Sequence, residues 1–93
     1  MQFLVTVSIF RPEAARPHMA AHLAYLQSAF AAGEIVAYGP FADHTGGWFI
    51  AEEPSLEAAD TLIGKDPIAR AEAAVYDVKA ILVAQASEKL VRV

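Results

Sequence analysis

Residues 2–10, QFLVTVSIF, constrain the fold more than any other segment, because they predict a β-strand that is apolar on both faces. β-Branched and aromatic side chains run through the segment without a helix-breaking or turn residue, which is typical of a strand. One face carries Phe3, Val5, Val7 and Ile9, and the other carries Leu4 and Phe10 with Thr6 and Ser8 between them. The sheet that contains this strand must therefore be covered on both sides.

The first half of the chain continues with a helix and a second strand. Proline at a first helical position loses no hydrogen bond, so we expect a helix to begin at Pro12 or Pro17 and to run to Ala32. Gly33 follows it and can adopt the left-handed conformation that ends many helices. Residues 34–40, EIVAYGP, then predict a short strand that ends at Gly39 and Pro40.

The second half repeats the pattern. Residues 41–47, FADHTGG, predict a loop, and residues 48–53, WFIAEE, predict a third strand. Ser55 is a suitable N-cap for a helix that ends near Gly64. Residues 65–72 predict a loop with one helical turn, and residues 74–84 predict the last strand. The tail from Gln85 to Val93 fits a strand swapped onto a partner or an extra turn against it.

This order of elements predicts an α+β, ferredoxin-like β-α-β-β-α-β fold in a single domain over residues 1–93. Its two helices can cover only one face of the sheet. The open face would take one residue from each of four pairs: Phe3 or Leu4, Ile35 or Val36, Trp48 or Phe49, and Tyr76 or Val78. Hydrophobic residues make up 56% of the chain, against about 45–50% in soluble domains. We therefore expect a two-fold homodimer that buries the open face.

Composition excludes several classes of function. The longest apolar stretches are shorter than the roughly 18–20 residues that a helix needs to cross a membrane. The first ten residues lack the positively charged n-region of a secretory signal peptide. Cysteine is absent, which removes disulfides and thiolate chemistry. A net charge of −4 with scattered basic residues argues against nucleic acid as a partner. We expect a cytoplasmic protein that binds a small molecule.

His22 stands out on the first predicted helix. On a helical projection it borders a core stripe formed by Met19, Leu23, Leu26 and Phe30, while His18 and Tyr25 lie toward solvent. A ring at that border is partly buried and can serve either as a structural group or as a reactive one. An i, i+4 histidine pair can also bind zinc, but His44, Asp43 and Asp66 lack a recognisable ligand spacing. We therefore predict no metal site.

From His22 onward the sequence HLAYLQSAFAAGEIVAYGPFADHTGG, followed by SLEAADTLIGKDPIARA and a valine-rich strand, resembles the YciI-like (YCII-related) family. The resemblance covers residues 2 to 83. Its most specific pieces are His22-Leu23 with Tyr25-Leu26, Gly33, Gly39-Pro40-Phe41, Asp43, Gly46-Gly47, Ser55 and Asp66-Pro67.

The resemblance implies a fold and a site. Members of this family form dimeric α/β barrels, similar in fold to muconolactone isomerases and to small monooxygenases. Their suspected active site pairs a helix-1 histidine with the aspartate of an Asp-Pro motif, which correspond here to His22 and Asp66. Some act in the breakdown of aromatic compounds, including the removal of chloride from a chlorinated hydroxyquinol. Several relatives carry an arginine where this chain has Met19, and Arg16 lies one turn earlier.

Residue chemistry supports the same pair. Imidazole has an unperturbed pKa of ~6.5, close to neutral pH, and a carboxylate that accepts one ring N–H fixes its tautomer. Asp66 precedes a proline, so its backbone is biased to an extended conformation. Its side chain can cap the following turn, hold His22, or do both.

We therefore expect an acid/base isomerase or lyase, without a cofactor, in which His22 and Asp66 are catalytic. Arg16, Tyr38, Asp43 and His44 are the predicted substrate-binding residues, with Tyr76 as a further hydroxyl donor. The alternative is a non-catalytic ligand-binding or accessory module, which predicts a His22 that is fully packed or turned away from any cavity. A haem- or quinol-handling monooxygenase of the same fold has no supporting motif.

Overall fold

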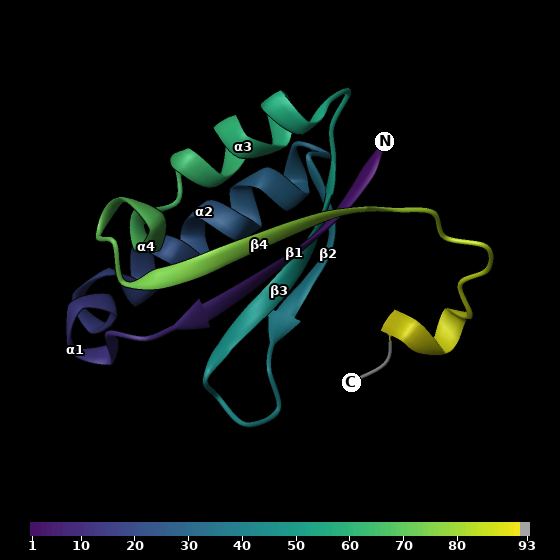
Figure 1. Ribbon diagram of the computed structural model, residues 1–93. Coiled ribbons are helices and arrows are strands. Elements are labelled where there is room, and N and C mark those ends of the chain that lie inside the picture. The colour runs from purple at the N-terminus through teal and green to yellow at the C-terminus, as the bar shows by residue number, and fades with distance from the viewer. Residues whose placement is uncertain (92–93) are drawn as a thin grey trace.

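The computed structural model describes residues 1–91 and has helices on one side of a four-stranded antiparallel sheet (Figure 1). The strand order is β2-β3-β1-β4, with β1 and β3 in the centre. The strands are β1 Gln2–Ile9, β2 Ile35–Pro40, β3 Gly46–Glu52 and β4 Ala74–Ile81. The helices are α1 Pro12–Ala15, α2 Met19–Ala31, α3 Leu56–Gly64 and α4 Pro67–Arg70, with 3₁₀ turns η1 Arg16–His18 and η2 Glu88–Val91. The predicted α+β, ferredoxin-like order is confirmed.

Local chemistry accounts for the helix ends. Pro12 begins α1, as expected of a proline at a first helical position. Pro17, which lacks an N–H donor, is the second residue of the 3₁₀ turn that separates α1 from α2, so the long helix begins only at Met19. Gly33 has φ +80°, so its missing Cβ allows the left-handed cap that was predicted. The Ser55 hydroxyl accepts a hydrogen bond from the Ala58 N–H at 3.1 Å and caps α3.

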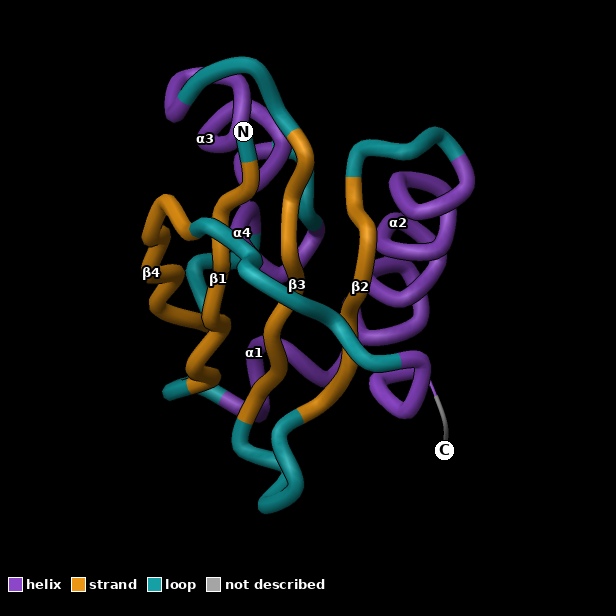
Figure 2. The backbone as a smooth tube through the Cα atoms, turned by 90° about the vertical axis from the view of Figure 1, so that its right-hand side faces the viewer, coloured by secondary structure: helices purple, strands orange, loops and turns teal. Residues whose placement is uncertain are grey.

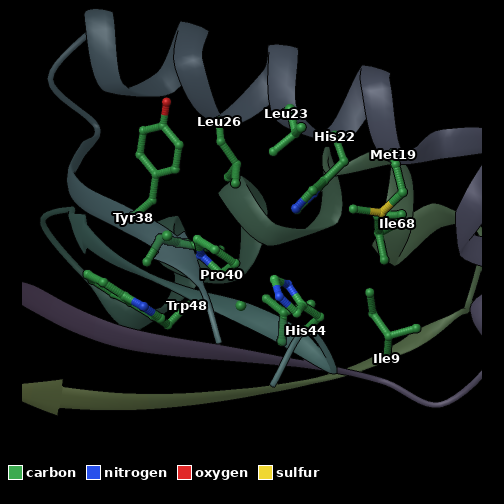
Figure 3. Close-up of a pocket in the computed structure, with 15 residues that line it drawn as sticks. Ile9, Met19, His22, Leu23, Leu26, Tyr38, Pro40, His44, Trp48 and Ile68 are labelled. Carbon is green, nitrogen blue, oxygen red and sulfur yellow. The ribbon is translucent and has the colours of Figure 1, made fainter. Parts of the chain in front are cut away.

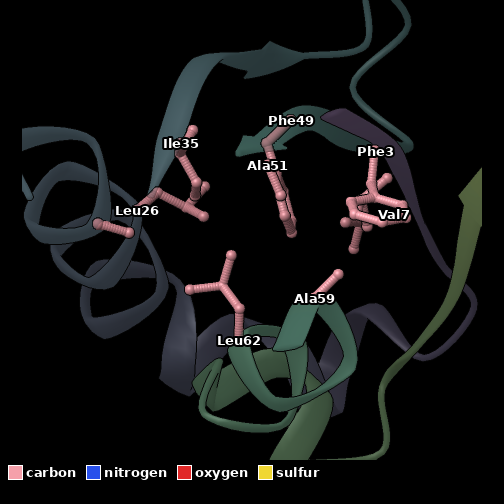
Figure 4. Close-up of a cluster of buried hydrophobic side chains, with 10 residues drawn as sticks. Phe3, Val7, Leu26, Ile35, Phe49, Ala51, Ala59 and Leu62 are labelled. Carbon is pink, nitrogen blue, oxygen red and sulfur yellow. The ribbon is translucent and has the colours of Figure 1, made fainter. Parts of the chain in front are cut away.

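The core lies between the sheet and the helices (Figure 4). Alternate residues of β1 point into it, and Phe3, Val5 and Val7 are at most 3% exposed. The other members are Leu26, Ala29, Ile35, Phe49, Ala51, Ala59 and Leu62. Burial of these side chains stabilises the fold by roughly 25 cal/mol per Å² of apolar surface.

The buried stripe of α2 differs from the projection. Leu26 and Ala29 are buried, whereas Leu23 is 48% and Phe30 is 51% exposed. Tyr25, expected toward solvent, packs against the core. The projection assumed that α2 packs only on the sheet, but α2 also contacts α4, and this rotates the buried stripe. His22 therefore lies within the buried stripe instead of at its border.

The open face of the sheet also differs from the expectation at one strand. Strand pairing places Leu4, Trp48 and Ile50 on the face away from the helices, together with Ala37 beyond the bulge in β2. Tyr76 and Val78 of β4 point to the helix side, so the prediction that one of them faces outward is wrong. Val75, Asp77 and Lys79 occupy the open face at that edge. A shift of one residue would exchange the two faces of β4. Asp77 and Lys79 alternate with Tyr76 and Val78, so the charged residues of this strand favour the observed register, a signal that the expectation did not use.

The segment after β4 leaves the sheet edge and passes across the open face toward the β2 side (Figure 2). It ends in η2, a single 3₁₀ turn, while residues 92 and 93 lie outside the described part of the chain. Several of its apolar side chains face solvent, with Leu82 99%, Leu90 63% and Val91 84% exposed.

Candidate active site

Asp66 is the one buried charged side chain in the described residues, with 0% of its surface exposed. The following proline holds its backbone extended, at φ −70° and ψ 127°, where it caps α4. Its Oδ1 accepts a hydrogen bond from the Ile68 N–H at 3.1 Å. The capping role predicted for the Asp-Pro pair is therefore present, and it leaves further lone pairs free for other donors.

His22 reaches Asp66 from α2. The His22 Nδ1 lies 2.7 Å from Asp66 Oδ1 and 2.9 Å from Oδ2. The two residues are 44 positions apart in the chain and meet because α2 packs against α4. A carboxylate only accepts hydrogen bonds, so Nδ1 carries a proton, and in the neutral imidazole Nε2 then has a free lone pair.

Tyr76 is the third side chain of this cluster. Its Oη donates a hydrogen bond to Asp66 Oδ2 at 2.7 Å. Burial, followed by the hydrogen bond to Asp66 and the charge of that carboxylate, raises the pKa of Tyr76 well above its ordinary value. The phenol therefore stays neutral and donates at any physiological pH. The sequence identified Tyr76 only as a donor to a ligand; its role on Asp66 depends on which face of β4 it occupies.

Tyr25 connects α2, the helix that carries His22, to α3. Its hydroxyl donates to the Leu62 carbonyl of α3. Burial, and then the negative charges of Glu34, Asp66 and Glu53, raise the pKa of Tyr25 to about 12. Because Tyr25 lies one turn from His22, this contact helps to fix the rotation of α2 about its axis.

A cavity of about 470 Å³ lies between α2 and the sheet, and His22 forms part of its wall (Figure 3). The His22 side chain is 12% exposed. It enters from α2, while His44 enters from the turn between β2 and β3 on the other side. Most of the remaining wall is apolar: Val7, Ile9, Met19, Leu23, Leu26, Pro40, Phe49 and Ile68, with Tyr38 and the glycines 39, 46 and 47. Trp48, which the strand pairing assigns to the open face, also borders the cavity. Since Nδ1 faces Asp66, Nε2 is the ring nitrogen on the cavity side.

The turn between β2 and β3 positions His44. Asp43 Oδ1 accepts hydrogen bonds from the Thr45 N–H at 3.1 Å and the Thr45 hydroxyl at 2.7 Å, and both lower the pKa of Asp43. His44 takes the left-handed conformation, φ 62°. Such a φ is uncommon outside glycine, although histidine is among the residue types that adopt it more often than most.

Gly46 and Gly47 allow close packing within the protein. A Cβ on Gly46 would lie 1.8 Å from the Val7 carbonyl oxygen, and one on Gly47 would lie 2.7 Å from the Gly39 carbonyl oxygen. The sequence left open a tight turn or a close approach of the backbone to a ligand. The close approach that the glycines permit is between neighbouring strands.

The structure separates the other predicted binding residues. Tyr38 contributes its ring to the cavity wall, packed edge-on against Phe30 with ring centres 5.9 Å apart. Asp43 does not line the cavity, because its carboxylate organises the turn. Arg16 lies outside it, in a neighbouring hollow. His18 is exposed, as predicted.

Residues 1–91 contain neither a metal-binding cluster nor a membrane-spanning helix. No group of three or more His, Asp or Glu side chains in this part of the chain is arranged to hold a metal ion. Nor does any helix in this range have the length and apolar character needed to cross a membrane.

Comparison with known proteins gives a family and two structural relatives. The family model described as a YCII-related domain matches residues 1–82. The structure is similar to 5-chloro-2-hydroxyhydroquinone dehydrochlorinase from Burkholderia phenoliruptrix AC1100, solved in complex with 2,5-dihydroxybenzoquinone. That match has a TM-score of 0.75 and 27% identity and covers 88% of this chain and 94% of the other.

The second relative is a muconolactone isomerase, with a TM-score of 0.74 and coverage of 95% of both chains. Its identity of 18% supports a common fold and no more. No curated protein sequence matches significantly.

Proposed function

This chain belongs to the YCII-related family, and on that premise we propose that it is an acid/base enzyme that moves a proton on a small ring-derived carbonyl or quinol compound. One observation carries the proposal: the Nδ1 of His22 lies 2.7 Å from the buried Asp66 carboxylate, and the same imidazole borders an apolar cavity of about 470 Å³. A cavity of this size holds a single-ring compound.

The proposed base is Nε2 of His22. With Nδ1–H donated to Asp66, Nε2 can remove a proton from a substrate carbon that is acidified by a neighbouring carbonyl. The imidazolium so formed is stabilised by the carboxylate against Nδ1, and Asp66 stays ionised throughout. Ile68 and Tyr76 keep that carboxylate in place with two further hydrogen bonds.

Two outcomes are open to the carbanion or enolate that results. If Nε2–H returns the proton to a different carbon of the conjugated system, the reaction is an isomerisation. If instead the electron pair expels a leaving group such as chloride from the adjacent carbon, the reaction is an elimination, and water later removes the proton from the imidazolium. The dehydrochlorinase and the isomerase among the structural relatives bear names of these two reaction types. Neither outcome requires a cofactor.

The alternative of a pure binding module is less well supported. It predicts a histidine that is fully packed or turned away from any hollow. Here the His22 ring lines the cavity, on the side opposite His44 (Figure 3).

Enzyme assays with His22→Asn, Asp66→Asn and a control variant, His18→Asn, test the proposal. The substrates are 5-chloro-2-hydroxyhydroquinone, followed by chloride release, and muconolactone, followed by ultraviolet absorbance. We expect turnover of at least one compound, a loss of about 10²–10⁴-fold in kcat in the first two variants, and none in the control. Full activity in His22→Asn, or no turnover of either compound by the wild-type protein, would contradict the proposal.

We further propose that two copies associate through the open face of the sheet. Leu4, Trp48, Ile50 and Ala37 make its central part apolar, and the exposed tail after β4 passes over the same side (Figure 2). A second copy that packs there would cover both. An exposed apolar face of this kind marks an interaction site.

Light scattering tests the dimer with a matched pair of variants. Ile50→Glu places a charge on the open face, whereas Leu56→Glu makes the same change on the helix side, where Leu56 is 53% exposed. We expect a dimeric wild-type protein, a monomeric Ile50→Glu variant and a dimeric Leu56→Glu variant. A monomeric wild-type protein at micromolar concentration would contradict the dimer.

A further inference from the structure

A second hollow, of about 380 Å³, opens beside the cavity that His22 borders. Ile9, Met19 and His44 line both spaces, so the two adjoin along these three side chains. The outer hollow is otherwise lined by Pro12, Ala15, Arg16 and Thr45. Together they form one cleft with an apolar inner part and a more polar outer part.

Arg16 is the one lining residue of either space with a permanent charge. No carboxylate lines the two spaces, because Asp66 lies behind His22. Within the described residues no carboxylate oxygen lies in ion-pair distance of Arg16, whereas the neighbouring Arg11 has Glu13 at 3.9 Å. The chain has a net charge of −4, yet no carboxylate of residues 1–91 lies beside the Arg16 guanidinium at the edge of the cleft. An anionic ligand could therefore pair with it.

We propose that the outer hollow is an anion subsite, in which Arg16 binds a carboxylate of the substrate while the substrate ring lies in the inner cavity against His22. This inference rests on the proposed function and narrows the substrate class to ring compounds with a short acidic side arm. Guanidinium binds carboxylates through two parallel N–H bonds, which would fix the direction of the ring as well as hold it. His44, which lines both spaces, lies where ring and arm would join.

The distance between the two groups suits such a compound. Arg16 and His22 are six residues apart on η1 and α2, which is about 9–10 Å along a helical axis. The flexible arginine side chain can shorten this gap. A six-membered ring with a two- or three-carbon acidic arm has a comparable length. Met19, the first residue of α2, lies between them in the chain and lines both spaces. An apolar linker between ring and carboxylate would therefore pass over an apolar side chain.

Binding without turnover tests the subsite. The probes are trans-cinnamate and trans-cinnamamide, which have the same shape and differ in charge, titrated into the full chain and followed by amide chemical shifts. The variants are Arg16→Gln, Arg16→Lys and a control, Lys65→Gln, which removes the same charge from an exposed position outside both hollows. We expect the acid to bind about three- to tenfold more tightly than the amide in the wild-type protein, in Arg16→Lys and in the control, and equally in Arg16→Gln.

Repeating the titration at two pH values separates Arg16 from the histidines. Guanidinium keeps its charge from pH 6.5 to 8.5, roughly, whereas imidazolium loses its charge as pH rises. A preference for the acid that persists at the higher pH therefore supports Arg16. Equal binding of the two probes, no binding of either, or an acid preference that survives in Arg16→Gln would overturn the subsite. Because no turnover is measured, these results stand apart from the assays of His22 and Asp66.

Discussion

Tyr76 Oη and Asp66 Oδ2 lie 2.7 Å apart, and this contact completes the set of donors around the buried carboxylate. A carboxylate that is fully removed from water must find its hydrogen bonds within the protein. Asp66 receives them from the Ile68 N–H, the His22 ring and the Tyr76 hydroxyl. No buried side-chain nitrogen or oxygen in the described residues lacks a partner. The site is thus assembled before any ligand arrives.

Tyr76→Phe should lower the stability of the protein. It removes a donor from a buried carboxylate, which costs about 1–3 kcal/mol in the free energy of unfolding, measured by urea denaturation. Tyr38→Phe is the matched control, because the Tyr38 hydroxyl makes no hydrogen bond to the described residues. An equal loss in both variants would show that the phenol on Asp66 has no special role.

Asp66→Asn should change the tautomer of His22. With the carboxylate in place, the neutral ring carries its proton on Nδ1 and not on Nε2. The amide can present an N–H to the ring, which favours the opposite tautomer and takes the lone pair away from the cavity. Nitrogen-15 chemical shifts of the imidazole report this directly. An unchanged tautomer in the variant would remove the orienting role assigned to Asp66.

Stability should fall in alkaline solution because of the two buried phenols. The pKa of Tyr25 is raised to about 12, and that of Tyr76 is raised further. Above about pH 10 the unfolded chain loses phenolic protons that the folded chain keeps, so deprotonation favours the unfolded state. The contribution of the two phenols to the free energy of unfolding is complete below about pH 10 and declines as the pH rises toward their pKa values in the folded protein. Urea midpoints between about pH 8 and pH 11 should fall in the wild-type protein and change less in a Tyr25→Phe, Tyr76→Phe double variant.

Gly46→Ala should destabilise the fold, while Gly64→Ala should not. A Cβ on Gly46 would lie 1.8 Å from the Val7 carbonyl oxygen, so β1 and β3 must separate there, at a cost of about 2 kcal/mol or more. Nothing lies within 4 Å of a Cβ on Gly64, the last residue of α3, where alanine is the better helix former. Thermal unfolding of the two variants measures the contrast. A Gly46→Ala variant as stable as the wild-type protein would mean that the strands have room to adjust.

The sequence by itself determined the order of the elements and the place of the two helix ends at Gly33 and Ser55. These depend on local chemistry: the apolar pattern of each segment, proline without an N–H, glycine at positive φ and a hydroxyl at an N-cap. It also singled out His22 and Asp66, through the resemblance of their motifs to those of the YCII-related family and through the chemistry of an imidazole beside a carboxylate.

Only the tertiary structure decided which side chains meet. The packing of α4 against α2 turned His22 into the buried stripe and left Leu23 half exposed at the cavity. The register of β4 turned Tyr76 toward Asp66 and its neighbours Val75 and Asp77 toward the open face. Asp43 and Arg16, chosen together from the sequence, lie in different surroundings, one inside a turn and the other in the outer hollow. A local pattern can favour the face that one segment buries. It does not show which distant side chain that face will meet, because such contacts join segments far apart in the chain.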